Sequence, residues 1–381
     1  MTRTLYRSSQ IILKDSILND GGVVVENGTI SALLEKEEAA VSTLNTVSGP
    51  WKYILPGFID LHVQGTAGFD IWSADPVQIG NLAKTLLRLG VTSFLATTEY
   101  RPTVVETVVQ TIEDGVGEDH ARIAGIHLEG PFINPARRGA IPEDVIQPPD
   151  KALLREIIDR CGGHLRMMTL APEMPGAMEL IPILVEGGIV PTVGHSEASY
   201  RDLTAAADLG LSHACHLFNA MGPINHREPG TAGGCLLLDS ISVQLIADGI
   251  HLHPDIFKLA LKLKPVGGAV LITDAVKAAG LGDGDYDMMG EPIKVREGRV
   301  TDRDGRLAGS VVTMPEALGN AMRFAGLDLV TASRLTSDNP ADVLGDSRRG
   351  IIAPDMAADL VFVDDDLKIL RVMKAGRLIE I

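Results

Sequence analysis

The chain has 381 residues, enough for one large domain with an appendage or for two separate domains. Lys and Arg total 34 against 50 Asp and Glu, and the formal net charge of −16 disfavours nucleic acid and anionic membranes as the main partners. Hydrophobic residues make up 45% of the chain, so we expect a large buried core. Three widely spaced cysteines and the lack of a long apolar run predict a soluble, cytoplasmic protein without disulfides or membrane spans.

Both ends of the chain have the pattern of short β-strands. Residues 22–34 contain two β-type runs joined by Asn27-Gly28, a pair suited to a tight hairpin turn. The last stretch alternates apolar and polar positions and turns at Ala375-Gly376. Because chain ends commonly meet in space, we expect one small β-sandwich domain built from both ends, residues 1–52 and 350–381.

Between the two ends, short apolar runs alternate with helical patterns. This alternation predicts a (β/α)₈ TIM-type barrel over residues 53–349, and it disfavours a doubly wound sheet. The predicted strands are 54–63, 91–97, 123–129, 164–171, 188–195, 212–218, 241–248 and 269–274. The predicted helices include 76–89, 102–114, 150–160, 176–187, 199–209 and one near 314–325.

Polar residues gather at the carboxyl ends of the predicted strands. In a barrel these ends form one face, and active sites lie on that face. Any one of these residues could be a structural histidine or a cap, but the whole set predicts an active site. The set is Asp60, His62, Thr97, Glu99, Glu129, Glu173, His195, His216, Asp248, His251 and Asp274.

Two histidines and one glutamate in this set are typical of a catalytic metal site. His195, His216 and Glu129 end three predicted strands, and such a ligand set leaves one tetrahedral position of a zinc-type ion open. The ion lowers the pKa of a bound water toward about 7, which serves hydrolysis. Asp274 would reach the same face and could carry the proton of that water to a leaving group. A role for Asp274 as a helix N-cap or turn residue is an equal alternative at this point.

Other metal and nucleotide motifs are missing from the sequence. There is no HExxH motif, no GxxxxGK[ST] motif, and no GxGxxG motif after a strand. The stretch Asp283-x-Asp285-x-Asp287 imitates the opening of an EF-hand, but Met288 stands where that loop needs glycine. We therefore predict a solvated turn there.

Nine motifs follow one another along the chain and carry a family resemblance. They are PGFID-x-H, HLEGPF, TLAPE, VGHS, HLFNAM, REPG, ADGIH, TDA and LAGS. Together they resemble the N-acetylglucosamine-6-phosphate deacetylase family of the amidohydrolase superfamily over nearly the whole chain. The resemblance implies a barrel with a split terminal sandwich. It also implies metal-dependent hydrolysis of the acetamido group of N-acetyl-D-glucosamine 6-phosphate to D-glucosamine 6-phosphate and acetate.

The resemblance also implies roles for individual residues. Glu129, His195 and His216 match the metal ligands, and Asp274 matches the catalytic acid/base. One divalent ion per subunit is implied, zinc first, with iron, manganese or cobalt as alternatives. The residues matched to substrate binding are Ala140, Ile141, Asn219, Ala220, Arg227, His251, Leu307, Ala308, Gly309 and Ser310.

Arg227 and His251 match groups that engage the phosphate of the substrate. In the family the arginine can reach the neighbouring site across a dimer interface, so the resemblance implies a homodimer. Simpler alternatives stay open: Arg227 could pair with Glu228 on the surface, Asn219 could be a turn residue, and residues 307–310 could open the following helix.

The sequence departs from the wider pattern at two places. His62-Val63-Gln64 has Gln where a second metal-binding histidine is usual, and TLAPE lacks the lysine of two-metal sites. We therefore predict one tightly held metal, with His62 either a weak extra ligand or a group that polarises the substrate. Ile141 stands where the family often has a histidine, which removes a polar group from the substrate pocket.

Three alternatives to this function remain at this point. They are a deacetylase of another N-acetyl-hexosamine phosphate such as N-acetylgalactosamine 6-phosphate, a cyclic-amide hydrolase, and a non-catalytic sugar-phosphate sensor. Arg227 with His251 favours a phosphorylated, acyclic substrate. The complete metal triad with Asp274 favours an enzyme over a sensor.

Overall fold

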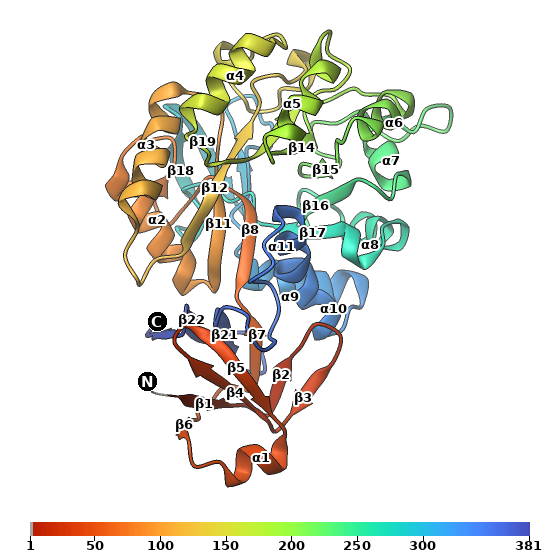
Figure 1. Cartoon of the computed structure of the whole chain (residues 1–381). Coiled ribbons are helices and arrows are strands. Elements are labelled where there is room, and N and C mark those ends of the chain that lie inside the picture. Colours follow the sequence, from red (N-terminus) through yellow and green to blue (C-terminus); the bar gives the residue numbers. More distant parts are fainter. Residues whose placement is uncertain (1–2) are drawn as a thin grey trace.

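The computed structural model describes residues 3–381 and has a larger α/β part above a smaller β part (Figure 1). The larger part contains a sheet in the order β8-β11-β12-β13-β14-β15-β16-β17, with parallel neighbours throughout. This confirms the predicted barrel. Its strands are β8 (Phe58–Val63), β11 (Val91–Thr98), β12 (Arg122–Glu129), β13 (Leu165–Leu170), β14 (Val190–Val193), β15 (His213–Ala214), β16 (Ser242–Ile246) and β17 (Ala269–Ile272).

The barrel closes through the residues that follow its first and last strands. Val63 bridges Ala275 in parallel, and the Asp274 amide donates a hydrogen bond to the His62 carbonyl at 2.9 Å. This closure brings the ends of β8 and β17 together, so residues from the first and last barrel strands share one corner of the barrel mouth.

Helices surround the barrel, and all six predicted ones are confirmed. Region 176–187 is a 3₁₀ turn (Ala177–Glu179) followed by α5. The helices α7, α8, α10 and α11 were not predicted, and α7 in particular is rich in glycine, a poor helix former. A Cβ at Gly234 would lie 2.4 Å from the end of the Leu203 side chain of α6, so glycine allows close packing of the two helices. The helices are α2 (Pro76–Arg88), α3 (Pro102–Asp114), α4 (Lys151–Arg160), α5 (Ile181–Glu186), α6 (Tyr200–Asp208), α7 (Gly230–Leu237), α8 (Pro254–Leu263), α9 (Met314–Ala325), α10 (Leu329–Thr336) and α11 (Asp338–Leu344).

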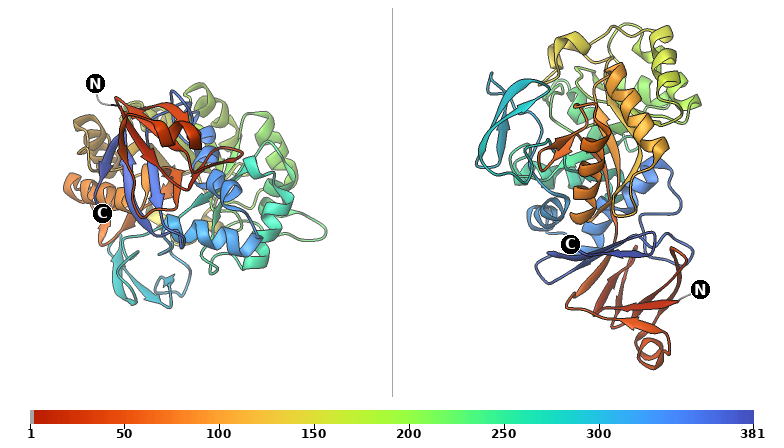
Figure 2. Two further views of the ribbon diagram at one scale, coloured as in Figure 1. Left: turned by 90° about the horizontal axis from the view of Figure 1, so that it is seen from below. Right: turned by 90° about the vertical axis from the view of Figure 1, so that its left-hand side faces the viewer.

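The smaller part is the predicted sandwich of both chain ends (Figure 2). One sheet has the order β5-β4-β1-β6 and the other β23-β22-β21-β7-β2-β3. Tyr6 and Val23 from the first sheet share a buried core with Ile54, Phe362 and Met373 from the second. The elements are β1 (Thr4–Arg7), β2 (Gln10–Ile12), β3 (Ile17–Asn19), β4 (Gly22–Glu26), β5 (Thr29–Leu34), α1 (Lys36–Val41), β6 (Asn45–Val47), β7 (Tyr53–Pro56), β21 (Leu360–Val363), β22 (Ile369–Lys374) and β23 (Arg377–Ile379).

The two predicted hairpin turns are present in this sandwich. Asn27 and Gly28 have φ of 52° and 82°, and Ala375 and Gly376 have φ of 48° and 78°. Two consecutive residues with positive φ are the mark of a type I′ turn, whose twist matches that of the flanking strands.

The predicted strand 54–63 is wrong in one respect, because it is two strands in two sheets. β7 pairs with β2 and β21 of the sandwich, whereas β8 pairs with β11 of the barrel. Gly57 separates them, and a Cβ there would lie 2.3 Å from the Thr92 hydroxyl. The division into two domains stays a prediction, and the pairing of β7 moves its expected boundary from residue 53 to Gly57.

A small antiparallel sheet between β17 and α9 was not predicted. It consists of β18 (Gly284–Met288), β19 (Glu291–Arg296) and β20 (Arg299–Thr301), and Figure 2 shows it beside the barrel, away from the sandwich. The predicted solvated turn at 283–287 is therefore mostly strand β18. Its acidic side chains Asp285 and Asp287 are solvent-exposed, as expected. Across residues 3–381, the helices are all too short or too polar to cross a membrane.

Candidate active site

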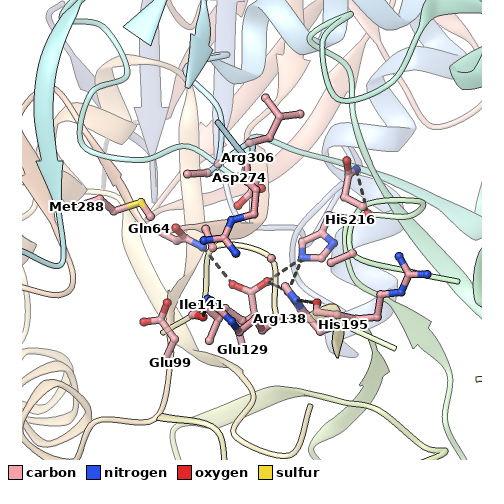
Figure 3. A pocket seen from close by; sticks show the side chains of 18 of the residues that line it. Gln64, Glu99, Glu129, Arg138, Ile141, His195, His216, Asp274, Met288 and Arg306 are labelled. Carbon is pink, nitrogen blue, oxygen red and sulfur yellow. Dashed lines mark hydrogen bonds and ion pairs between the residues drawn. The ribbon is translucent and has the colours of Figure 1, made fainter. Parts of the chain in front are cut away.

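Three side chains meet where β12, β14 and β15 end (Figure 3). Glu129 Oε1 lies 2.9 Å from His195 Nε2 and 2.7 Å from His216 Nε2, and the two nitrogens are 3.1 Å apart. All three residues are buried. The structure therefore brings together the three residues that the sequence predicts as metal ligands.

The hydrogen bonds of His195 suit a metal ligand. Its Nδ1–H donates to the Arg137 carbonyl at 2.9 Å, which leaves the lone pair of Nε2 facing Glu129 and His216. A backbone carbonyl that fixes the tautomer in this way is typical of metal-bound histidine. Two imidazole nitrogens and one carboxylate oxygen around one point fit a divalent, zinc-type ion.

The electrostatic setting keeps Glu129 ionised. Burial alone would raise its pKa, but the charge of His62 and the nearby imidazoles of His195 and His216 outweigh burial and hold the pKa well below the usual value. Gln64 Nε2 also donates to Glu129 Oε2 at 3.2 Å. Gln64 thus presents its amide group to Glu129 as a hydrogen-bond donor.

Asp274 lies beside this centre, and His62 stands between it and Glu129. His62 Nε2 is 3.2 Å from Asp274 Oδ1 and 3.6 Å from Glu129 Oε2, while its Nδ1 faces the Gln244 side-chain oxygen at 3.3 Å. His62 is fully buried and links the two carboxylates. It is therefore placed to orient Asp274, and its role as an extra ligand or as a group that polarises the substrate stays a prediction.

Three predicted site residues have backbone conformations that side chains other than glycine seldom adopt. The φ angles of His195, Ala220 and Asp274 are 50°, 53° and 49°. Hydrogen bonds hold each of them; for example, the Ser310 amide donates to the Asp274 carbonyl at 2.8 Å. Such strained residues cluster at functional sites. The alternative role of Asp274 as a helix N-cap is wrong, because no helix begins there.

A cavity of about 530 Å³ opens over the centre. Eight predicted substrate-binding residues line it, and Ser310 lies behind them with its amide bonded to Asp274. Residues 307–310 form a loop against the cavity and do not open a helix, since α9 begins at Met314. The eight residues are Ala140, Ile141, Asn219, Ala220, His251, Leu307, Ala308 and Gly309.

Arg227 is the predicted substrate residue that this chain does not bring to the cavity. It is exposed on the loop before α7, which Figure 1 shows extending outward from the barrel. Its amide bonds the Asn225 side chain at 3.0 Å, and Glu228 instead accepts from the Tyr200 amide at 3.1 Å. The simple Arg227–Glu228 surface pair is absent among the ion pairs of the described residues.

Several strand-end residues have structural roles. Asp60 accepts a hydrogen bond from the Thr273 hydroxyl at 2.6 Å, and Glu173 accepts one from Ser196 at 2.7 Å. Asp248 Oδ2 lies 2.6 Å from Nδ1 of His251 and so holds the ring of this lining residue. The common position of these residues at strand ends predicted that they lie at one face of the barrel, but it could not separate supporting groups from groups placed for chemistry.

Sequence reasoning missed some residues that line the cavity. Arg137 and Arg138 precede the predicted Ala140, so their position beside a matched motif was the signal available. Arg306 precedes the LAGS loop in the same way. Met288 comes from the unpredicted sheet, and no local pattern points to it.

Comparison with known proteins places this geometry in a family. A model of the amidohydrolase family matches residues 53–379. The chain belongs to the amidohydrolase family.

Relatives within this family match nearly the whole chain. It is 34% identical to the N-acetylglucosamine-6-phosphate deacetylase of Lysinibacillus sphaericus, over 98% of each chain. It is 32% identical to the N-acetylgalactosamine-6-phosphate deacetylase of Escherichia coli O157:H7, over 99% of each. A solved mutant N-acetyl-D-glucosamine-6-phosphate deacetylase from Mycobacterium smegmatis, in complex with N-acetyl-D-glucosamine-6-phosphate, is 30% identical with a TM-score of 0.92 and 99% coverage of both chains.

Proposed function

We propose that this amidohydrolase hydrolyses the acetamido group of N-acetyl-D-glucosamine 6-phosphate, giving D-glucosamine 6-phosphate and acetate. The observation that carries the proposal is the convergence of Glu129 Oε1, His195 Nε2 and His216 Nε2 within 3.1 Å, beside Asp274, under a cavity of substrate size. Relatives that share the whole chain and carry this name support the choice of substrate.

Glu129, His195 and His216 would hold one divalent ion, which we propose to be zinc. When bound, such an ion supplies a Lewis acid for the amide carbonyl and lowers the pKa of a water molecule. Gln64 is a hydrogen-bond donor in this arrangement, which supports a single ion.

The cytoplasm is the location we propose, where the three buried, unpaired cysteines would stay reduced.

Asp274 carries out both proton transfers. Its carboxylate takes a proton from the attacking water, and the same carboxyl group then gives that proton to the leaving amine nitrogen. His62, 3.2 Å away, holds the carboxylate in place, and the bond from Ser310 to the Asp274 carbonyl fixes its backbone. The carbon–nitrogen bond breaks as the amine becomes protonated, and acetate is released.

We also propose that the active enzyme is a homodimer in which Arg227 of one copy binds the phosphate in the other. Arg227 does not line the cavity of its own chain, and it lies exposed on a projecting loop. Two apolar side chains, one on this loop and one at the end of α7, are uncovered: Ile224 is 51% exposed and Leu237 is 57% exposed. Exposed apolar residues beside a charged loop suit a contact with a second copy.

A substrate panel tests the proposed reaction. We expect acetate release from N-acetylglucosamine 6-phosphate with kcat/KM at least 100-fold above that for unphosphorylated N-acetylglucosamine, because a desolvated phosphate with charge-assisted bonds contributes about 3 kcal/mol or more. The C4 epimer, N-acetylgalactosamine 6-phosphate, tests the alternative function that the Escherichia coli relative suggests. A higher kcat/KM for this epimer would transfer the assignment to it, and equal rates on all three compounds would exclude a phosphate site.

Removal of Arg227 tests the shared site. We expect Arg227→Ala to raise KM for the phosphorylated substrate about tenfold or more and to leave kinetics on the unphosphorylated sugar unchanged. Arg201→Ala, at another exposed arginine on α6, serves as the control. Sedimentation velocity should show a dimer for all three proteins. A monomeric wild-type enzyme, or an unchanged KM in the Arg227 variant, would contradict the shared site.

A further inference from the structure

Four arginines line a second pocket, of about 270 Å³, at the base of the barrel. Arg122 opens β12, and Arg166 is the second residue of β13. Arg348 and Arg349 lie on the segment that runs from α11 to the sandwich (Figure 1). Glu129 ends the eight-residue strand β12 at the opposite face of the barrel, about 20 Å from Arg122. This arginine pocket is therefore separate from the catalytic cavity, with which it shares no lining residue.

The carboxylates beside the arginine pocket are too few to neutralise it. Asp346 Oδ2 accepts a hydrogen bond from Arg349 at 3.0 Å and one from Arg122 at 3.4 Å. Asp359 Oδ2 accepts one from Arg349 at 3.2 Å. Four guanidinium groups thus face two carboxylates, and four minus two leaves a local charge of +2 in a chain whose net charge is −16. The pocket attracts anions although the protein as a whole repels them.

Two of the four arginines have N–H groups to spare. Arg166 donates from Nη2 to the carbonyl of Leu344, a neutral acceptor, at 2.8 Å. Arg348 is exposed, and its guanidinium group has no ion pair or hydrogen bond within residues 3–381. Burial, followed by the positive charge of Arg349, lowers the pKa of Arg122 below its usual value. An anion in the pocket would relieve this repulsion between like charges.

We propose that the arginine pocket binds a phosphate dianion, either free phosphate or the phosphate group of a small ester. The planar fork of a guanidinium group bonds two phosphate oxygens at once, and several forks around one pocket suit phosphate better than a monovalent ion such as chloride. The pocket joins the first residues of β12 and β13 to the segment that enters the sandwich. Bound phosphate would therefore hold these parts of the chain together and stabilise the folded protein.

Calorimetric titration of the full chain with inorganic phosphate, against sodium chloride at equal ionic strength, tests the site. We expect saturable binding with a Kd of about 1 mM or below, because charge-assisted hydrogen bonds from several arginines add up. The melting temperature should rise with phosphate concentration and not with chloride. Glycerol 3-phosphate is the second arm. Tighter binding of this ester than of phosphate identifies an ester as the ligand, and weaker binding identifies the free ion.

Substitutions assign the binding to the arginine pocket. Arg348→Glu is the first variant, because this exposed side chain supports no other group, and it should weaken phosphate binding about tenfold or more. Arg166→Ala should do the same. Arg201→Ala, at an exposed arginine on α6, should keep the wild-type affinity. Arg227→Ala should keep it too, because Arg227 is proposed to serve the catalytic cavity. In the Arg348 and Arg166 variants kcat and KM should stay at their wild-type values.

Three outcomes would overturn the proposal. Phosphate affinity that is unchanged in both Arg348→Glu and Arg166→Ala, or lost in Arg227→Ala, would place the anion in the catalytic cavity. Equal effects of phosphate and chloride at one ionic strength would mean general screening without a site. A lower melting temperature of Arg166→Ala with unchanged phosphate affinity would mean that Arg166 only fastens β13 to the end of α11. The binding measurements do not use the proposed deacetylation, so their failure and the failure of that function are distinguishable.

Discussion

Asp274→Asn is expected to lower kcat by about 10²- to 10⁴-fold while the metal stays bound, because a positioned acid/base residue contributes a factor of this size. Asparagine keeps the shape of the side chain, so its neighbours should not move. It cannot take a proton from water, and it cannot return one to the amine. Because Asp274 is not one of the three proposed metal ligands, the loss should appear in kcat with little change in metal content.

The measurement is acetate release under saturating substrate, with metal content determined on the same samples. Asp283→Asn, at an exposed carboxylate before β18, provides the matched control and should behave as wild type. A His62→Asn variant adds a second comparison, because His62 acts through Asp274 across 3.2 Å in our proposal. It should lower kcat less than Asp274→Asn does. If Asp274→Asn kept half of the wild-type kcat with metal bound, the proton would have to travel by another group.

The barrel and the grouping of Glu129, His195 and His216 could be predicted because both follow from local patterns. Each barrel strand has its own apolar run, and the polar residue at its carboxyl end lies on one face once the barrel is assumed. Glu129, His195 and His216 could thus be grouped without knowing any distance. Their separation within 3.1 Å is a result of the structure.

Features that depend on distant parts of the chain could not be predicted in the same way. The run 54–63 is one apolar stretch in sequence, and only the pairing of β7 with strands from both chain ends divides it at Gly57. Arg227 has a place in a matched motif, but only the structure shows that it is exposed on a loop and does not line the cavity of its own chain. Glu99 was one polar strand end among many, and its place in the cavity wall beside Glu129 became visible only in the structure.

The role of the ligand set can be tested independently of Asp274 through Glu129. We expect Glu129→Gln to lose most of its bound metal and to lower kcat/KM by about a thousandfold or more, because an ion of this type contributes several kcal/mol to catalysis. Glutamine preserves the volume of the side chain but removes the negative charge that two histidines and His62 face. The three imidazoles would then surround a neutral amide, which no longer offsets the charge of a divalent ion.

Metal analysis of the dialysed protein, followed by kinetics with and without added zinc, separates the two consequences of this change. Wild type should contain about one ion per chain, and a chelator should remove its activity reversibly. Glu186→Gln, at an exposed glutamate at the end of α5, should match wild type. A Glu129→Gln enzyme that kept a full complement of metal and normal kinetics would show that the ion is held elsewhere. Because Asp274→Asn should keep its metal and Glu129→Gln should not, the pair of variants distinguishes a residue that moves protons from one that holds the ion.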